Sequence, residues 1–378
     1  MAKKSTFFDE LRKWGFIIFF ALLKKINWNW ARSFLYASIA EKNLSPTPYK
    51  NPLLNISVLR KEFPNPIGIS AGFDPSFKYN DELMSFGFGF EEFGTFTINP
   101  VGGRPSVHFA PNQKGLFVES LKFNNIGIKA AQKALIERRH LPYIVGVSIA
   151  SNFEQQNEDK GGGNVLFSKI ESELTELVQR AAPYCDYIVL NLSHPVLPIS
   201  TLSINLSTLE QIVRQLKTVI QKVAPISNPP LLIKVPLDVS PAHIPLLAET
   251  LLRENVDGII LGGYLGLSPA QRKQLKLSNS YGHLTGAPLR AATTQLVEQF
   301  YSVLQGRIPI IASGGTFTGD DAFEKITAGA SLVQIHTAIL YDGPKIANKI
   351  NARLADLLKQ HGFRSLQDAV GSKFRNKV

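Results

Sequence analysis

The sequence predicts an α/β protein, a (β/α)8 TIM barrel with an amphipathic helical extension at its N-terminus. Eight short apolar runs recur along the 378 residues, and segments with the spacing of amphipathic helices separate most of them. Both the chain length and this alternation of strands and helices are typical of one such barrel. Strands this uniformly apolar are buried on both faces, which indicates a parallel sheet covered by helices. The runs span residues 67–71, 87–93, 143–149, 187–192, 231–235, 258–261, 308–312 and 332–335.

Amphipathic segments between these runs predict the covering helices. Ser207 is the expected N-cap of one of them, and another is expected to start directly after Ser240. Eight repeated units favour closure into a barrel, and an open doubly wound sheet is the alternative. The predicted helices span residues 128–138, 164–182, 209–223, 241–254, 320–328 and 344–361.

The longest connection runs from Phe93 to Tyr143, between the second and third strands. It contains turn signals at residues 99–103 and then the helix at 128–138. Because connections that follow barrel strands lie on the catalytic face, we expect this one to form a lid there.

The N-terminal segment has its own character. Residues 14–23 are ten apolar residues flanked by basic pairs, whereas a membrane-spanning helix needs about 20. Three interpretations are possible for this segment: a secretory signal peptide, a helix packed on the barrel, or a pair of amphipathic helices in the lipid interface. Aromatic and basic residues recur through the segment, so we favour the third. The predicted domains are therefore membrane-associating helices over residues 1–45 and the barrel over residues 46–378.

Charge and composition narrow the possible partners. The chain has 41 basic and 30 acidic residues, a net charge of +11, which suits nucleic acid, anionic lipid or an anionic small ligand. The sequence has no zinc-finger spacing, RNP signature or basic helix followed by heptads, so we expect no nucleic-acid partner. The seven histidines show no HExxH motif and no paired spacing, so we expect no metal site. The single cysteine, Cys185, gives no sign of an oxidising compartment, and we expect its thiol to be buried.

Candidate functional residues follow from the fold, because active sites of such barrels lie at the C-terminal ends of the strands. Gly314 and Gly315 follow the seventh strand and His336 and Thr337 the eighth, in the region where barrels bind phosphate through backbone N–H groups. Ordinary turn glycines are the alternative. The remaining candidates are Ala71, Gly72, Thr95, Ser148, Asn191, Ser193, His194, Lys234, Gly262 and Gly263.

Lys234 ends the apolar strand at residues 231–235. A lysine inside a barrel mouth requires an anionic partner, because an unpaired buried charge is strongly unfavourable. A flavin is one such partner, since negative charge develops at its N1–C2 edge on reduction. A nearby carboxylate is the alternative.

At these residues the chain resembles the membrane-bound, quinone-dependent dihydroorotate dehydrogenases. The resemblance runs from about residue 63 to residue 373, and the N-terminal helices resemble the quinone-tunnel lid of that family. The stretches that carry it include residues 65–74 (NPIGISAGFD), 123–127 (FNNIG), 191–193 (NLS), 284–289 (LTGAPL), 328–334 (AGASLVQ) and 362–371 (GFRSLQDAVG).

The resemblance implies FMN as the cofactor. It also implies a small-molecule substrate, a membrane quinone as electron acceptor and a peripheral position on a lipid surface, at the cytoplasmic face. It says nothing of the oligomeric state. Two FMN positions depart from the family, with Ser148 in place of asparagine and Gly262 in place of threonine. The positions that match are Ala71, Gly72, Thr95, Asn191, Lys234, Gly286, Gly314, Gly315, His336 and Thr337.

The substrate positions depart further from the family. Pro75 replaces a lysine, and the family motif N-x-S-S-P-N reads NLSHPV at residues 191–196. His194 therefore stands at the position of the family's serine base, and imidazole accepts a proton near neutral pH. A plain polar loop residue is the alternative for His194. Each lost polar ligand costs about 1–3 kcal/mol, so we expect dihydroorotate to bind poorly unless other residues substitute. The candidate substrate residues are Asn191, Glu119, Val196, Gly263 and Tyr264.

Three functions are consistent with this pattern. The first is a working dihydroorotate dehydrogenase of pyrimidine biosynthesis with His194 as its base. The second is an FMN oxidoreductase with a more apolar substrate, lined by residues such as Tyr264, Val196 and Pro75. The third is a non-catalytic paralogue that binds a ligand or partner at the membrane.

Overall fold

The structure is a computed structural model of the chain. The predicted membrane-associating segment lies outside the described residues except for Leu35, which is buried. Across the part that is described, no helix combines the length and the apolar character needed to cross a bilayer. The described residues are 35, 48–75, 77, 79–102, 107–109, 116–119, 124–138, 142–151, 163–193, 206–268, 273 and 283–375.

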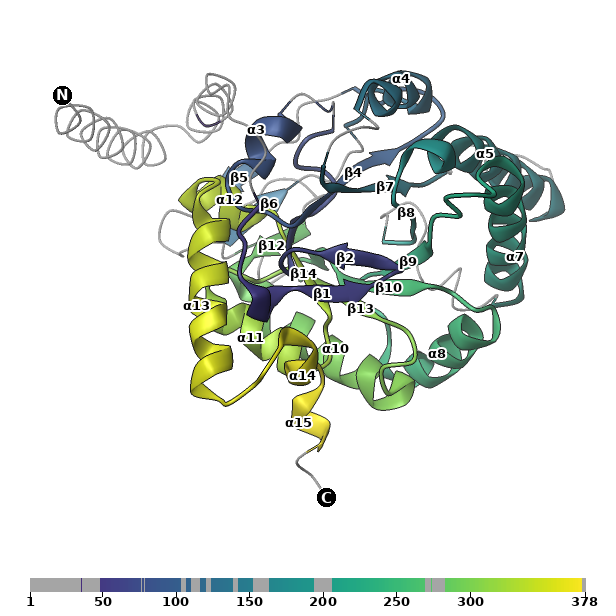
Figure 1. The fold of residues 1–378 in the computed structure, drawn as a ribbon. Helices are drawn as coiled ribbons and strands as arrows, with labels where there is room; N and C mark the ends of the chain where they lie inside the picture. The colour runs from purple at the N-terminus through teal and green to yellow at the C-terminus, as the bar shows by residue number, and fades with distance from the viewer. Residues whose placement is uncertain are drawn as a thin grey trace, which may run out of the picture.

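Eight parallel strands close into a barrel, and their order around the barrel follows the chain (Figure 1). All eight predicted runs are present, and β14 pairs with β3 to complete the ring. The closed ring excludes the open doubly wound sheet. The strands are β3 (Ile67–Ile69), β4 (Phe90–Phe96), β7 (Ile144–Ile149), β8 (Tyr187–Asn191), β9 (Leu231–Val235), β10 (Gly258–Gly262), β13 (Ile310–Ser313) and β14 (Leu332–Ile335).

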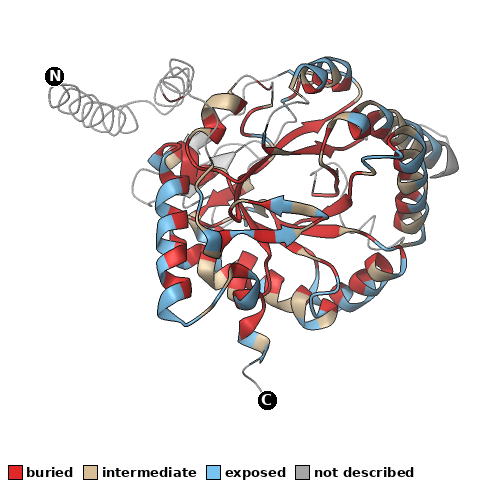
Figure 2. Cartoon of the chain, in the orientation of Figure 1, coloured by how far each residue is buried: buried red, intermediate tan, exposed pale blue. Residues whose placement is uncertain are grey.

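Helices surround the barrel with their buried faces toward the strands and their exposed faces outward (Figure 2). In α7, for example, the buried residues recur at the three- and four-residue spacing that puts them on one face. The main helices are α4 (Ile128–Arg138), α5 (Gly163–Ala181), α7 (Leu206–Val223), α8 (Ile244–Arg253), α10 (Arg290–Leu304), α11 (Gly319–Thr327) and α13 (Ile346–Gln360). Shorter ones are α3 (Asn80–Met84), α12 (Thr337–Asp342), α14 (Leu366–Ala369), α15 (Ser372–Arg375) and the 3-10 turns η1 (Pro52–Leu54), η2 (Ala182–Tyr184), η3 (Pro241–His243) and η4 (Ala287–Leu289).

The predicted N-cap at Ser207 is wrong, whereas the predicted helix start after Ser240 is confirmed. The helix expected to follow Ser207 begins at Leu206, so Ser207 lies inside its first turn. Ser240 precedes the turn η3 and makes no side-chain cap hydrogen bond. A capping box forms instead on α11, where the Thr318 hydroxyl accepts from the Asp321 backbone and the Asp321 carboxylate accepts from the Thr318 backbone.

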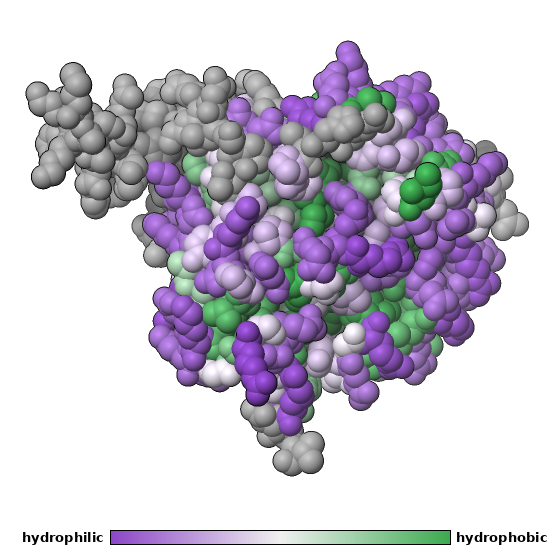
Figure 3. Space-filling view, viewed as in Figure 1, coloured by the Kyte–Doolittle hydropathy of each residue, from purple (hydrophilic) through white to green (hydrophobic). Residues whose placement is uncertain are grey.

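The two ends of the barrel are covered differently. At the N-terminal end lies the hairpin of β1 (Ile56–Val58) and β2 (Lys61–Phe63), and the Phe63 ring packs edge-on against Phe90 at the start of β4. The molecular face seen from this side is mostly hydrophilic (Figure 3). At the C-terminal end, an antiparallel sheet runs in the order β11 (Leu265–Gly266), β12 (His283–Gly286), β6 (Leu116–Glu119) and β5 (Val107–Phe109). The long connection after β4 supplies β5 and β6, so its described strands lie at the end of the barrel where the sequence predicts the site.

A fully buried lysine, Lys325 on α11, has a consequence for the pH dependence of stability. Its ammonium donates to the Arg290 carbonyl and the Thr294 hydroxyl, both at 3.3 Å, and burial lowers the pKa of Lys325 to about 8. In the unfolded chain a lysine titrates near pH 10.4. Between these two values the unfolded state binds more protons, so the free energy of unfolding rises with pH.

We predict that Lys325→Met removes this rise. Urea unfolding at pH 7, 8.5 and 10 should show wild type gaining about 3 kcal/mol more than the variant across the range, as a pKa difference of roughly two units requires. All other titrating groups are common to both proteins, so the difference isolates Lys325. Equal slopes would show that Lys325 keeps an ordinary pKa in the folded state.

Candidate functional site

The predicted cofactor residues gather on one face of the barrel, because all eight strands run parallel and end there. Ala71 and Gly72 follow β3, Thr95 and Ser148 lie near the ends of β4 and β7, and Asn191 ends β8. Further round the ring come Lys234 in β9, Gly262 at the end of β10, Gly314 and Gly315 after β13, and His336 and Thr337 after β14. The structure thus brings together residues that are up to 266 positions apart in sequence, from 71 to 337.

A hydrogen-bonded set of side chains links β4, β7 and β8 at this face. The Thr95 and Ser148 hydroxyls lie 3.0 Å apart, and the Asn191 amide nitrogen donates to the Thr95 hydroxyl at 2.8 Å. The Asn191 amide oxygen accepts from the Ser193 backbone and hydroxyl, at 2.9 and 2.5 Å. All four residues are buried. The orientation of the Asn191 amide is therefore set by its neighbours, and its NH2 group can still offer a second hydrogen to a flat polar ligand.

Lys234 lies beside this set, since β9 pairs Lys234 with Asn191 on one side and with Ile260 on β10 on the other. The side chain is only 6% exposed. Among the described residues, its ammonium has neither a hydrogen-bond acceptor nor a carboxylate at ion-pair distance. A buried ammonium in this situation fits an anionic or strongly electron-rich group placed over the barrel mouth.

Backbone geometry shapes the opposite side of the face, around β13 and β14. Gly315 has a φ of +70°, and a Cβ there would lie 2.2 Å from the Arg290 backbone nitrogen. The loop after β13 therefore passes directly against the start of α10, which only glycine permits. Nearby, the Thr337 hydroxyl donates to the Thr285 hydroxyl at 3.4 Å. This corner offers backbone N–H groups and small hydroxyls rather than charged side chains.

The loop after β10 explains one departure from the family pattern. Gly262 has a φ of +122°, and a Cβ there would lie 1.8 Å from the Ser313 carbonyl oxygen. The same carbonyl accepts a hydrogen bond from the Gly263 backbone at 2.9 Å. The threonine of the family cannot occupy position 262 in this backbone, so the substitution and the loop conformation belong together.

His336 and Gly72 lie side by side, as expected for neighbours on β14 and β3. A Cβ on Gly72 would lie 3.6 Å from the His336 imidazole, and the Gly72 backbone donates to the Gly94 carbonyl at 2.7 Å. The Phe73 ring meets the imidazole edge-on at 5.6 Å between centroids. Gly72, which has no side chain, thus leaves room for the His336 imidazole beside it.

The candidate substrate residues are only partly described. Tyr264 follows β10, and its ring contacts His283 of β12 at 4.6 Å between centroids. Burial raises the pKa of the Tyr264 phenol, with Asp238 adding to the effect, so this group is a proton donor rather than a base at neutral pH. Glu119 lies on β6, where its backbone pairs with His283. The predicted base, His194, and Val196 lie outside the described residues.

Some residues at this face were missed by the sequence analysis. Thr285 and His283 belong to the antiparallel sheet, whose strands are too short for any recognisable periodicity. Glu92 and Gln334 point into the barrel beneath the face and are joined by a hydrogen bond of 2.6 Å. The sequence does contain a signal for Glu92 and Gln334, because each is a polar residue within a run of mostly apolar residues.

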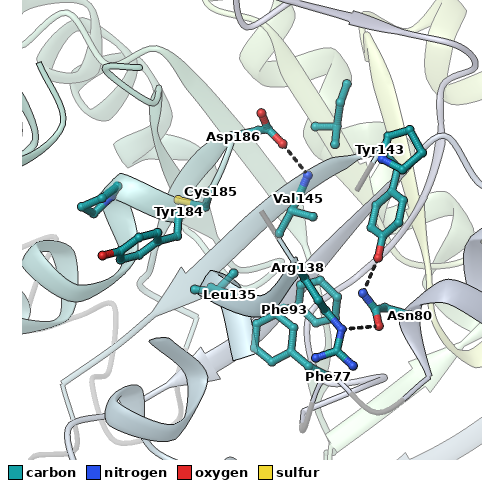
Figure 4. Close-up of a pocket in the computed structure, with 13 residues that line it drawn as sticks. Phe77, Asn80, Phe93, Leu135, Arg138, Tyr143, Val145, Tyr184, Cys185 and Asp186 are labelled. Atoms are coloured by element: carbon teal, nitrogen blue, oxygen red, sulfur yellow. Dashed lines mark hydrogen bonds between the residues drawn. The ribbon is translucent and has the colours of Figure 1, made fainter. Parts of the chain in front are cut away.

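A cavity of about 430 Å³ lies outside the barrel, between α3, α4 and the starts of β7 and β8 (Figure 4). Its polar residues bond mainly to one another. Arg138 donates to the Asn80 side chain at 2.9 Å, Asn80 donates to the Tyr143 hydroxyl, and the Asp186 carboxylate accepts from the Val145 backbone at 2.9 Å. None of the predicted site residues lines it. Over the described ranges, no three histidine, cysteine, aspartate or glutamate side chains gather as a metal site.

Comparisons with known proteins agree with this geometry. The family model described as dihydroorotate dehydrogenase matches residues 53–358. The chain is 34% identical to the dihydroorotate dehydrogenase (quinone) of Azorhizobium caulinodans, over 86% of this chain and 89% of that protein. It is 32% identical to the mitochondrial dihydroorotate dehydrogenase (quinone) of Oryza sativa subsp. japonica, over 85% of this chain and 72% of that protein.

Solved structures with a similar fold come from the same family. The crystal structure of DHODH from Eimeria tenella in complex with ferulenol matches with a TM-score of 0.77 and 26% identity, covering 93% of this chain and 96% of that one. The ligand-free form from the same organism matches with a TM-score of 0.76 and 27% identity. By its fold, by the family model and by its curated relatives, the chain belongs to the family of quinone-dependent dihydroorotate dehydrogenases, which are oxidoreductases.

Proposed function

We propose that the chain binds FMN at the C-terminal face of the barrel, oxidises dihydroorotate to orotate and passes the electrons to a membrane quinone. The observation that carries the proposal is Lys234, a buried ammonium that has no described ion-pair partner and lies beside the Thr95–Ser148–Asn191 hydrogen-bonded set. The curated relatives are named for this reaction.

The residues of this face fit FMN as follows. Lys234 and Asn191 would hold the polar edge of the ring system, and Ala71 and Gly72 would lie beneath it. Backbone N–H groups would hold the phosphate, because glycines let the backbone approach an anion closely. When bound, FMN supplies a hydride acceptor at its N5 atom. The phosphate-side residues are Gly286, Gly314, Gly315, His336 and Thr337.

A base must remove the second hydrogen of the substrate as a proton. The Ser193 hydroxyl is engaged with the Asn191 amide oxygen at 2.5 Å, where it orients Asn191. The Tyr264 phenol keeps its proton, since burial raises its pKa. His194 follows Ser193 directly and is the remaining group in this loop that accepts a proton near neutral pH. We therefore assign the role of base to His194.

The quinone and the lipid surface would meet the chain at residues 1–45. The aromatic and basic residues of this segment suit an interfacial pair of helices. Such helices would place the C-terminal face of the barrel next to the bilayer, on its cytoplasmic side, where a quinone dissolved in the membrane could reach the flavin.

A flavin oxidoreductase with a more apolar substrate is the second candidate. Gly263 and Tyr264 stand where the family has asparagine and threonine, and Pro75 stands where it has lysine. The half-buried Tyr264 ring packs against His283 beside the expected substrate position. These replacements remove side chains that could hydrogen-bond to a polar substrate and introduce an aromatic ring in their place.

An anaerobic titration with dihydroorotate distinguishes the two candidates. We expect the oxidised-flavin absorbance of the detergent-purified protein to bleach and to recover when a quinone is added. His194→Ala should bind FMN normally but bleach at least 100-fold more slowly, because general bases contribute roughly 10²–10⁴-fold to such rates. A flavin band that dihydroorotate leaves unchanged would exclude it as the substrate and favour the second candidate. A protein that carries no flavin would contradict both.

The placement of the cofactor is tested at Lys234. We expect Lys234→Ala to purify without flavin, or to bind added FMN at least tenfold more weakly, because a hydrogen bond to a charged group contributes about 1.5–3 kcal/mol. Visible absorbance and FMN titration measure this, and circular dichroism checks that the fold is intact. Lys217→Ala is the matched control, since Lys217 lies on the outer helix α7 beside Asp257. A variant as yellow as wild type would place the flavin elsewhere.

A further inference from the structure

Three polar side chains fill one layer of the barrel interior beneath the proposed flavin position. Glu92 comes from β4, Tyr187 from β8 and Gln334 from β14, and each is no more than 1% exposed. These are alternate strands of the ring, as expected for side chains that share a layer in such a barrel.

A glycine on the intervening strand β7 makes room for one of these large groups. Gly146 is paired with Glu92 on β4 and with Tyr187 on β8. A Cβ on Gly146 would lie 2.0 Å from the Tyr187 ring. The interior is therefore built to hold this polar layer, where a barrel core usually holds branched apolar side chains.

Glu92 is the charged member of the layer. One carboxylate oxygen accepts from the Gln334 amide at 2.6 Å, and the other is buried with no hydrogen-bond partner. Burial raises the pKa of Glu92, and Lys234 on β9 opposes that shift more strongly than any other group. A buried carboxylate stays ionised only when a positive charge compensates for the water it has lost.

Lys234 is thus placed between two partners. On one side is the proposed flavin edge, and on the other is the Glu92 carboxylate within the barrel. No direct ion pair joins the two side chains, but Lys234 acts electrostatically on the Glu92 carboxylate. At this separation their charges still act on each other through a medium of low polarity.

We propose that Glu92 is a positioning residue that offsets the charge of Lys234 and thereby lowers the reduction potential of the flavin. This inference rests on the proposed binding of FMN. With Glu92 ionised, Lys234 stabilises negative charge on the reduced flavin less than an uncompensated lysine would. The barrel interior, and not only the residues that touch the cofactor, then sets how readily electrons leave for the acceptor.

The test is the midpoint potential of the flavin in the purified full-length protein, measured by dye-coupled reduction at pH 8. Glu92→Gln keeps the shape and removes the charge. We expect its potential to be higher than that of wild type, by about a tenfold change in the ratio of reduced to oxidised flavin, which for a two-electron couple is about 30 mV. An unchanged potential overturns the proposal.

Glu91→Gln is the matched control. Glu91 is the neighbouring residue on β4 and is also fully buried, but it faces the outside of the barrel, where Asp74, Arg138 and Asp81 act on it. We expect this variant to keep the wild-type potential. An equal rise in both variants would show that any change in β4 moves the potential, and would overturn the proposal.

The pH dependence of the flavin potential distinguishes an electrostatic role of Glu92 from a merely structural one. The titratable groups that face Glu92 are Lys234 from β9 and Tyr187 from β8, with neutral Gln334 from β14. As the pH falls, Glu92 takes up a proton, so the wild-type potential should approach that of Glu92→Gln. A difference that stays constant from pH 8 to pH 5 counts against the proposal.

If Glu92→Gln does not fold, Gln334→Leu serves in its place. It removes the amide hydrogen bond that lowers the pKa of Glu92, so the pKa of Glu92 should rise further, less of its charge should remain to offset Lys234, and the potential should again rise. An unchanged potential in a yellow Gln334→Leu protein overturns the proposal. A wild-type protein without flavin would instead contradict the proposed function, so the two failures are distinguishable.

Discussion

The pairing of β14 with β3 is the constraint on which the rest of the molecule depends. It joins Val333 to Ile67 and Ile335 to Ile69, and so turns a sheet into a closed ring. Closure has two effects. It removes both sheet edges, and it brings the ends of eight strands to one face, where residues from the two ends of the barrel domain meet. His336 can lie against Gly72 only because this pairing exists.

Closure also creates an interior that water does not reach, and the chain places charge there. Lys234 and Glu92 are both buried, and each lacks a direct ionic partner among the described residues. Apolar residues of similar volume would stabilise a barrel more, since buried charges seldom repay their desolvation. A chain that keeps both charges gives up stability at this point, which is typical of a functional site. Glu91 on the same strand is also a buried carboxylate, it has no hydrogen bond among the described residues, and it faces away from the site.

Much of the fold could be predicted, because strands buried on both faces are apolar throughout and are easily seen in a sequence. Helix α4 has the predicted bounds because its apolar residues recur at regular helical spacing, which is also easily seen in a sequence. The antiparallel sheet over the site was not foreseen. Its strands have two to four residues, and β6 pairs with β12 across a long stretch of chain, as between Leu116 and Gly286. The Glu92–Gln334 bond was missed because it depends on the register of strands at opposite ends of the chain.

The contrast between the cofactor side and the substrate side of the face has a physical cause. The phosphate corner is built from backbone groups, held by glycines such as Gly315 whose φ of +70° and close contact with Arg290 admit no side chain. Backbone groups bind in the same way whatever side chains surround them, so this corner tolerates change nearby. A substrate held by side chains depends on the identity of each of those residues, because every substitution among them removes or adds a hydrogen bond directly. Under the proposed function, Pro75, His194 and Tyr264 would therefore determine which substrate is oxidised, while the backbone of the barrel would hold the flavin.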